Sequence, residues 1–344
     1  MRPRLMVSVL VVAGLSTMGA ARAPSEQPTP PASAATPSAM PVSSWRQAFT
    51  FADQRVDESS GLVASRAHPG AVWTVNDGQG PVRLFAVDSG GRTRAVVTLD
   101  GVEGVDPEAL GGAVGQDGKS YLYVGDIGGN PVPRPDGVVV YRLAEPATLA
   151  DARVKATAYR LTYPDGQHDA ESLLVNPRSG QLFVMTKTAK GGALYRAPAR
   201  LSESRPNMLT LVRDSPYVIS DGLILPDGRL LLRGYNKARV WKDLDAAAPE
   251  LTLDLPQQRQ GEGVAVTADG RGLLISSEGA LSPVWRMDLP ATRDEVREER
   301  PAVTAVAETD SFPTTGMLWG VGGGLALTLL AAGLVVAVRA EGRT

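Results

Sequence analysis

The sequence contains no cysteine and only two histidines, and these shortages narrow the chemistry available to the chain. Without cysteine there is no disulfide, no thiolate metal site, no cysteine nucleophile and no lipid-modified N-terminal cysteine. Zinc and copper favour histidine and cysteine ligands, so sites for either metal are disfavoured. The formal net charge of -2 leaves no basic surplus to neutralise phosphates, which argues against nucleic-acid binding.

The marks of several common folds and enzymes are also missing. No Gly-x-Ser-x-Gly nucleophile elbow occurs, so a serine hydrolase is unsupported. The Gly-His and Trp-Asp marks of WD40 repeats are absent. No long amphipathic helix pattern interrupts residues 45–307. This stretch is therefore predicted to be all-β.

The sequence does contain a short phrase that occurs five times: an acidic or hydroxyl residue, a small residue and an apolar run. A turn rich in Gly, Asp or Pro follows each copy, and a second apolar run follows the turn. Successive copies are 48, 63, 50 and 41 residues apart, a period typical of propeller blades or solenoid repeats. The five copies begin at Ser60, Glu108, Glu171, Asp221 and Glu262.

The apolar runs within each unit have the character of β-strands. They are short, rich in Val, Leu and Tyr, and bounded by Gly, Pro and Asp. A unit of about 50 residues with four such runs is typical of a propeller blade, which is a four-stranded sheet. We therefore predict one domain over residues 45–307, a five-bladed β-propeller. The alternative is six blades, which would need a further copy of the phrase near residue 310.

The fifth unit shows only three strands of its own, so we expect an N-terminal strand to complete it. Residues 46–51 precede the first copy and have the pattern of an outer strand. Their pairing with the last blade would close the ring and remove an exposed sheet edge. Residues 302–306 compete for the same place.

The N-terminus has the features of an export signal. Two arginines precede an apolar run, and Ala21-Arg22-Ala23 has the small-x-small form of a cleavage site, which predicts a signal peptide over residues 1–23. The alternative is an uncleaved membrane anchor. Residues 24–44 consist mainly of Pro, Ala, Ser and Thr, and they are predicted to form a disordered linker.

The C-terminus predicts attachment to a membrane. Residues 317–338 form an uncharged apolar run long enough to span a bilayer, and the basic tail 339–344 places the last residues in the cytoplasm and the propeller outside. The spacer 308–316 ends in Phe312-Pro313-Thr314-Thr315-Gly316. This motif resembles the Leu-Pro-x-Thr-Gly sorting signal that sortases join to the cell wall, with Phe in place of Leu. The alternative is a plain spacer before a retained helix.

Acidic residues are expected to gather at one mouth of the central channel, because the first strand of each blade lines that channel. Converging carboxylates repel one another unless a cation lies between them. Oxygen ligands suit Ca²⁺ or Mg²⁺, and we favour Ca²⁺. The alternative is that each acid accepts backbone hydrogen bonds from a neighbouring blade. The predicted metal ligands are Glu58, Glu108, Glu171, Asp221 and Glu262, with Asp106 and Asp169 close by in the sequence.

A second group of polar residues follows the second strand of each unit, and these residues would surround the same mouth. Each of them taken alone is also compatible with a solvated turn. Together they predict a polar funnel for a ligand that the sequence does not identify. The predicted ligand-binding residues are Asp77, Asp126, Asn130, Lys187, Arg233 and Glu278.

The two histidines differ in position. His68 lies in a turn and is predicted to be at the surface. His168 precedes the third inner strand, and a general base there is chemically possible because His titrates near neutral pH and Asp169 could orient it. The alternative is a loop histidine without a catalytic role.

These short motifs resemble the SdiA-regulated family of exported five-bladed propellers over residues 45–307. A looser likeness extends to the esterase-like domain of phytases and to calcium-dependent gluconolactonase propellers. The resemblance implies the fold, whereas propellers host binding, scaffolding and hydrolysis alike. The residues that carry it are Ser60-Gly61-Leu62, Asp106-Pro107-Glu108, Glu171, Asp221-Gly222, Glu262-Gly263-Val264-Ala265 and Ser277-Glu278.

Two functions remain open from the sequence. The first is a surface-anchored module that binds a small-molecule or protein ligand and holds a divalent cation in its channel. The second is a metal-dependent hydrolase of phosphate esters or lactones, in which the ion activates water. They differ in whether the ion keeps a coordination position open toward a pocket.

Overall fold

The computed structural model describes residues 38–40, 44–129, 134 and 137–289. The chain divides into two compact units, Met1–Thr36 and Pro37–Thr344, and all described residues belong to the second. In these ranges no helix is long and apolar enough to cross a membrane. The predicted signal peptide, sorting motif, membrane span and basic tail all lie outside the described residues.

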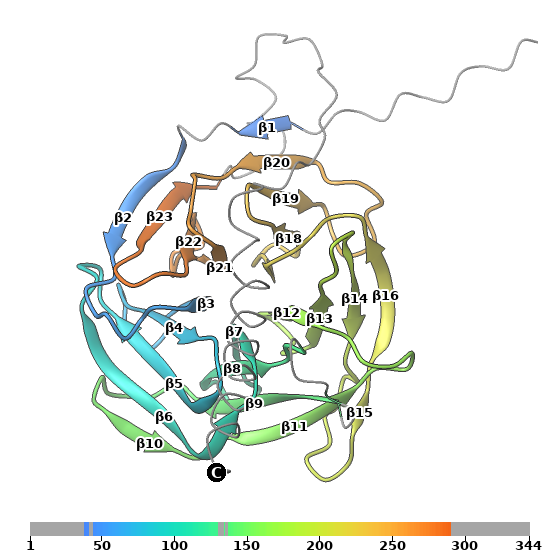
Figure 1. Ribbon diagram of the computed structural model, residues 1–344, viewed down its shortest axis with the longest axis horizontal. Coiled ribbons are helices and arrows are strands. Elements are labelled where there is room, and N and C mark those ends of the chain that lie inside the picture. The colour runs from blue at the N-terminus through green and yellow to red at the C-terminus, as the bar shows by residue number, and fades with distance from the viewer. Residues whose placement is uncertain (1–37, 41–43, 130–133, 135–136, 290–344) are drawn as a thin grey trace, which may run out of the picture. The chain divides into compact units, whose positions relative to one another are not determined.

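Five β-sheets are arranged around a central channel (Figure 1), which confirms the prediction of a five-bladed propeller. Blade 1 contains β3 (Ser59–Ala64), β4 (Val72–Asn76), β5 (Gly80–Val87), β6 (Thr93–Gly104) and β10 (Ala152–Val154). Blade 2 contains β7 (Pro107–Val114), β8 (Ser120–Asp126), β9 (Val138–Ala144), β11 (Thr157–Thr162) and β15 (Asn207–Met208). Blade 3 contains β12 (Ala170–Val175), β13 (Leu182–Thr186), β14 (Gly192–Arg196) and β16 (Thr210–Ser215).

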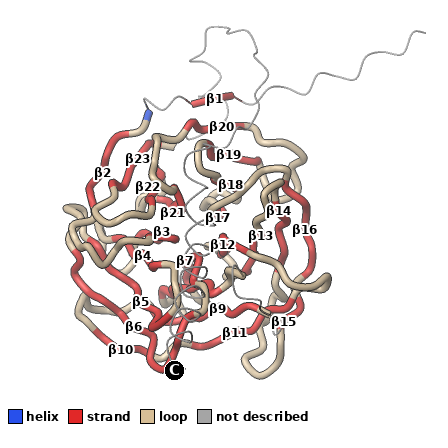
Figure 2. The backbone as a smooth tube through the Cα atoms, in the orientation of Figure 1, coloured by secondary structure: helices blue, strands red, loops and turns tan. Residues whose placement is uncertain are grey.

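The last two blades include strands from the N-terminal end of the described chain. Blade 4 contains β17 (Asp221–Ile224), β18 (Leu230–Arg233), β19 (Lys237–Trp241), β20 (Leu251–Asp254) and β1 (Ser38–Met40). Blade 5 contains β21 (Gly261–Val266), β22 (Gly272–Ser277), β23 (Pro283–Asp288) and β2 (Arg46–Thr50). In Figure 2 the inner strands of the blades converge on the centre, and loops connect each blade to the next.

The N-terminal strand β2 closes the ring, as the sequence analysis expected. It pairs with β23 in antiparallel fashion, with Arg46 opposite Arg286 and Thr50 opposite Pro283. Figure 1 shows β2, in blue, beside β23, in orange. Strands from opposite ends of the described chain therefore form one blade, and neither β2 nor β23 needs residues 302–306 as its partner.

Three blades carry an additional short strand that the sequence analysis did not predict. Each of these strands pairs in parallel with the outermost antiparallel strand: β10 with β6, β15 with β11, and β1 with β20. An outer strand presents unpaired N–H and C=O groups, and even two or three residues can pair with some of them. β1 lies within residues 24–44, which the composition predicted to be a disordered linker.

The hydrophobic core is divided into five clusters, and each cluster draws its buried side chains from two neighbouring blades. Trp73 of blade 1, for example, packs in one cluster with Leu122 of blade 2. Phe51, just beyond β2, packs in another with Leu62 of blade 1 and Val284 of blade 5. The apolar surfaces between blades therefore stabilise the ring.

Candidate functional site

The first residue of the repeated phrase lies at an irregularity in the pairing of four of the five inner strands. The pairing registers skip Ser60, Glu108, Glu171 and the pair Glu262-Gly263. A β-bulge of this kind changes the direction of the side chain that it contains, and bulges are common beside functional sites. Strand β17 has regular pairing, with Asp221 opposite Arg233.

Asp221 consequently has a different environment from the other acids. It is 2 % exposed, and its Oδ1 accepts hydrogen bonds from the Gly222 N–H (2.7 Å) and from the Ser172 hydroxyl (3.3 Å). Its Oδ2 accepts from the Val264 N–H at 2.7 Å. Burial raises the pKa of Asp221 to about 8, although these hydrogen bonds oppose the shift. Asp221 thus joins blades 3, 4 and 5, which is the inter-blade alternative described above.

Three other carboxylates converge at the channel mouth, and we call them the acid cluster: Asp77, Asp106 and Glu108. One oxygen from each lies within 4.8 Å of the other two. Asp77 directly follows β4, Asp106 connects β6 to β7, and Glu108 is the bulge residue of β7. Oxygen ligands at this separation can hold a hard divalent cation.

Burial and mutual repulsion make the charged forms of the acid cluster costly. Burial raises the pKa of Asp77 above its ordinary value. Burial raises that of Glu108 much further, and Glu171, Asp77 and Glu262 add to the shift. Glu58, at the exposed edge of the group, has its pKa raised by burial and by Asp77. A bound cation would offset all of these effects at once.

The loop that follows β8 supports the acid cluster from one side. Asp126 is 1 % exposed and accepts hydrogen bonds from the N–H groups of Val105 and Asp106, the latter at 2.8 Å, and from Nη1 of Arg134 at 2.7 Å. A Cβ at Gly128 would collide with the Asp106 carboxylate, so this position of the loop requires glycine. Asp126 was predicted to bind a ligand, and the structure places it behind Asp106, where it holds the backbone.

Lys187 is a cation at this mouth, and its charge offsets part of the rise that burial causes in the pKa of Asp77. Its Nζ is 2.6 Å from Oε1 of Glu171 and 3.4 Å from the hydroxyl of Tyr235. Burial alone would lower the pKa of Lys187, but Glu171 and Glu262 raise it above its ordinary value. Burial raises the pKa of Glu171 to about 8, and Lys187 offsets part of that shift.

Two further carboxylates complete the site. Glu262 is 2 % exposed, and burial raises its pKa to about 7, with Lys187 opposing and Glu278 reinforcing the shift. Burial, together with Asp77 and Glu58, raises the pKa of Glu278 to about 7. Both groups can therefore exchange a proton near neutral pH.

Arg233, also predicted to bind a ligand, is fully buried. Its guanidinium donates to the carbonyl oxygens of Gly263 (3.0 Å) and Ser276 (3.3 Å) and to Oε1 of Gln258 (3.0 Å). Burial lowers its pKa to about 10, against the attraction of Glu262 and Asp221. Arg233 therefore connects blades 4 and 5 beneath the mouth. The predicted residue Asn130 lies outside the described residues.

His168 lies in an aromatic group to one side of the mouth. Its Nε2 is 3.0 Å from Oδ1 of Asp165 and 3.3 Å from the Tyr195 hydroxyl, and its ring contacts Tyr163 with centroids 4.8 Å apart. The residue that orients His168 is thus Asp165, whereas Asp169 accepts a hydrogen bond from the Gly129 N–H at 2.9 Å.

Two further residues lie at the mouth, and of these only Tyr235 was not singled out from the sequence. Tyr235 comes two residues after the end of β18, and Lys187 comes one residue after the end of β13. This equivalent position in the two blades was the sequence feature that could have identified Tyr235. Ser60 is the bulge residue of β3 and is 1 % exposed. Its hydroxyl has no hydrogen-bond partner in the part of the chain that the structure describes.

Comparison with known proteins gives distant structural neighbours. No family model and no curated protein matches the sequence. A calcium-binding protein, regucalcin, from Agrobacterium tumefaciens has 13 % identity and a TM-score of 0.42, and the match covers 73 % of this chain and 95 % of that chain. A gluconolactonase from Xanthomonas campestris has 17 % identity and a TM-score of 0.40, with coverage of 70 % and 89 %.

A luciferin-regenerating enzyme has 12 % identity and a TM-score of 0.42, with coverage of 69 % of this chain and 80 % of that chain. The neighbours thus include regucalcin- and gluconolactonase-type propellers. At these values the likeness assigns no function to this chain.

Proposed function

We propose that this chain is an exported, surface-anchored propeller that holds a divalent cation, of the calcium type, at its channel mouth and binds a ligand there. The observation that carries the proposal is the convergence of Asp77, Asp106 and Glu108 within 4.8 Å. Ca²⁺ takes six to eight oxygen ligands, so three carboxylates would leave positions for water, other protein oxygens and the ligand.

The surroundings of the acid cluster fit a ligand with anionic or polar oxygens. Such a ligand could occupy open positions on the cation and accept a hydrogen bond from Lys187, which is held by Glu171 at 2.6 Å. Glu278 and Glu262, with pKa values near 7, could donate to it in their protonated forms. Export and anchoring follow from the terminal segments of the sequence, which predict a signal peptide and a membrane span.

Calcium binding should be visible as stabilisation of the folded chain. An ion that binds only the folded state adds about 2.7 kcal/mol to the free energy of unfolding at a hundredfold excess over its dissociation constant. Calcium should raise the unfolding midpoint and a chelator should lower it. Glu108→Gln and Asp77→Asn should each weaken this response, because an amide keeps the shape and loses the charge.

The matched control is Glu103→Gln, which changes an exposed acid near the end of β6. It should leave the calcium response unchanged. An unfolding midpoint that calcium does not shift in the natural chain would disprove the cation site.

A second function, a metal-dependent hydrolase of phosphate esters or lactones, is favoured by one observation. Glu262 and Glu278 have pKa values near 7, so either could transfer a proton while a cation polarised the substrate. Calcium-dependent turnover of p-nitrophenyl phosphate or of simple lactones, lost in Glu108→Gln, would support it. Calcium stabilisation without turnover on such a panel would favour the binding module.

A further inference from the structure

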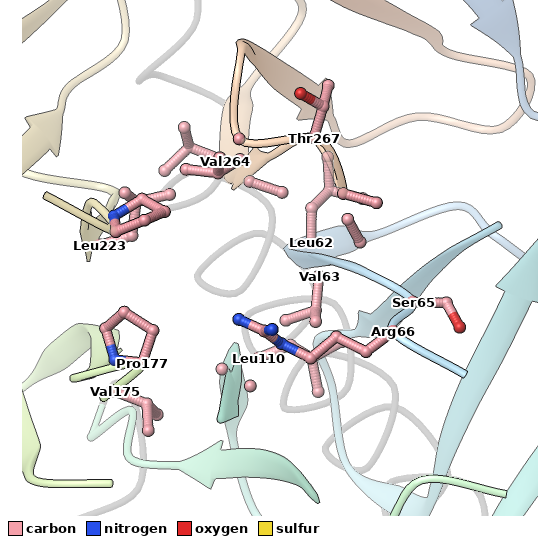
Figure 3. A pocket seen from close by; sticks show the side chains of 18 of the residues that line it. Leu62, Val63, Ser65, Arg66, Leu110, Val175, Pro177, Leu223, Val264 and Thr267 are labelled. Atoms are coloured by element: carbon pink, nitrogen blue, oxygen red, sulfur yellow. The ribbon is translucent and has the colours of Figure 1, made fainter. Parts of the chain in front are cut away.

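A second cavity lies along the channel, away from the acid cluster. Its volume is about 600 Å³, and its walls come from the later halves of the inner strands and from the turns that follow them (Figure 3). Glu108 opens β7, whereas the lining residue Gly112 lies four positions further along the same strand. At about 3.3 Å per residue, Gly112 lies about 13 Å along the strand from Glu108, and the lining begins at Leu110, about 7 Å from Glu108. No residue of the acid cluster lines the cavity, so the two are neighbouring but separate sites.

Slightly more than half of the cavity wall is apolar, and each blade contributes aliphatic side chains to it. Figure 3 shows the aliphatic side chains of the five inner strands around a common space. One labelled example from each blade is Val63, Leu110, Val175, Leu223 and Val264. Cavities of about 300–1,000 Å³ with apolar walls are typical of small-molecule sites. The cavity therefore suits the apolar part of a small molecule.

The charged side chains of the lining differ in their partners. Asp269 accepts hydrogen bonds from the Thr267 hydroxyl and the Arg271 N–H and lies 4.0 Å from Nη2 of Arg286. Arg66, in contrast, is exposed, and no described residue makes a hydrogen bond or ion pair with its guanidinium. In Figure 3 this guanidinium extends into the space beside Leu110.

The backbone of Arg66 has a fixed position although no described residue pairs with its guanidinium. Its N–H donates to Oε2 of Glu145 at 3.3 Å, and the Ser65 hydroxyl donates to Oε1 of the same carboxylate. Trp73 Nε1 donates to that carboxylate as well, at 2.9 Å. The start of the Arg66 side chain is thus anchored to blade 1 and to the connection between β9 and β10. A guanidinium pairs well with oxyanions, often through two parallel hydrogen bonds.

We propose that this cavity binds a small amphipathic anion, with its apolar body among the aliphatic side chains and its single carboxylate-like group on Arg66. The proposal rests on the aliphatic side chains of the wall and on the Arg66 guanidinium, which no described residue pairs. It does not depend on the function proposed for the acid cluster.

The test compares octanoate with 1-octanol, which has the same chain length and no charge, by calorimetric titration of the full chain. Octanoate should bind more tightly. Arg66→Gln should weaken octanoate binding about tenfold and leave octanol binding unchanged, since a charged hydrogen bond contributes about that factor. The matched control is Arg178→Gln, in the turn after β12, because Arg178, unlike its neighbour Pro177, does not line the cavity; it should change neither affinity.

Two more variants locate the site. Leu223→Trp and Val63→Phe, which fill the cavity, should abolish binding of both probes, and their melting curves will show whether they fold. Asp77→Asn, at the acid cluster, should have no effect.

Equal binding of octanoate by the natural chain and Arg66→Gln would overturn the role of Arg66. Binding that survives both filled variants in folded form would place the probes elsewhere and overturn the site. Failure of both probes to bind the natural chain would mean that solvent or another occupant, such as a protein segment, fills the cavity, and would equally overturn the proposal.

Discussion

Glu108 and Asp221 occupy the same position of the repeated phrase and yet have different roles. Glu108 lies at a bulge and joins the acid cluster, whereas Asp221 lies in regular pairing and accepts hydrogen bonds from the neighbouring blade. One additional backbone residue is enough to turn a side chain from one environment to the other. The repeated acid therefore supports two kinds of contact in one ring.

The contrast between these two acids can be measured with Asp221→Asn. The amide nitrogen of Asn cannot accept from the Val264 N–H, so a buried donor loses its partner. We expect the free energy of unfolding to fall by about 1–3 kcal/mol, equally with calcium and with a chelator. Urea denaturation under both conditions measures this. A loss confined to calcium-containing buffer would instead make Asp221 an ion ligand.

The buried acids also predict how stability depends on pH. Glu262 and Glu278 have an ordinary pKa of 4.5 when unfolded and about 7 when folded. Between these values the folded state binds more protons than the unfolded state, so a rise in pH lowers stability. In the presence of a chelator, the free energy of unfolding should fall by about 3 kcal/mol or more from about pH 5 to about pH 8.

Calcium should reduce this fall, because the ion favours the deprotonated acids. Urea denaturation at a series of pH values, with and without calcium, provides the measurement. Stability that rises through this window in the chelator would show that these carboxylates are not buried as the structure has them.

The sequence predicted which acids open the inner strands, but not which of them converge. Glu171 and Glu262 both raise the pKa of Glu108, which places these three acids near one another at the mouth. Glu58 lies beside Asp77, which raises its pKa. The sequence around Asp126 and Arg233 did not indicate that these residues are buried. It also did not indicate that they form hydrogen bonds with backbone groups. A polar residue at the end of a strand has the same local sequence pattern whether its side chain faces solvent or the next blade.

At the scale of elements, most strands follow from short apolar runs between turns. The closure by β2 was also predictable, because blade 5 lacked a fourth strand. The parallel strands β1, β10 and β15 were not, since strands of two or three residues show no alternation. Their position depends on an available outer edge, which is a property of the assembled blade.

The importance of β2 can be tested by truncation. Removal of residues 24–37 should leave thermal stability nearly unchanged, because it ends before β1. Removal of residues 24–52 deletes β1 and also β2 with the buried Trp45 and Phe51, and the melting temperature should fall by at least about 10 °C. Phe51→Ala, which retains the strand, should give an intermediate loss. Equal melting temperatures for the two truncations would refute closure by β2.

At the scale of the whole molecule, the predicted address can be tested at Thr315. If Phe312–Gly316 is a sorting signal, the protein in a Gram-positive host should resist detergent extraction and be released by wall-digesting enzymes. Thr315→Ala should make it extractable, since a sortase cleaves between Thr and Gly. Complete detergent extraction of the unmutated protein would leave the membrane helix as the sole anchor.

The pairing of β2 with β23 also sets the order of events when the chain is made. Arg46 forms an ion pair with Asp288, 242 residues later in the chain. During synthesis β2 is therefore available long before its partner, and the edge of β2 that pairs with β23 stays unpaired until almost the whole propeller has emerged. Contacts of such sequence separation slow folding and leave edges open to aggregation. The closing strand thus makes ring formation a late step, for which the entire domain must be present.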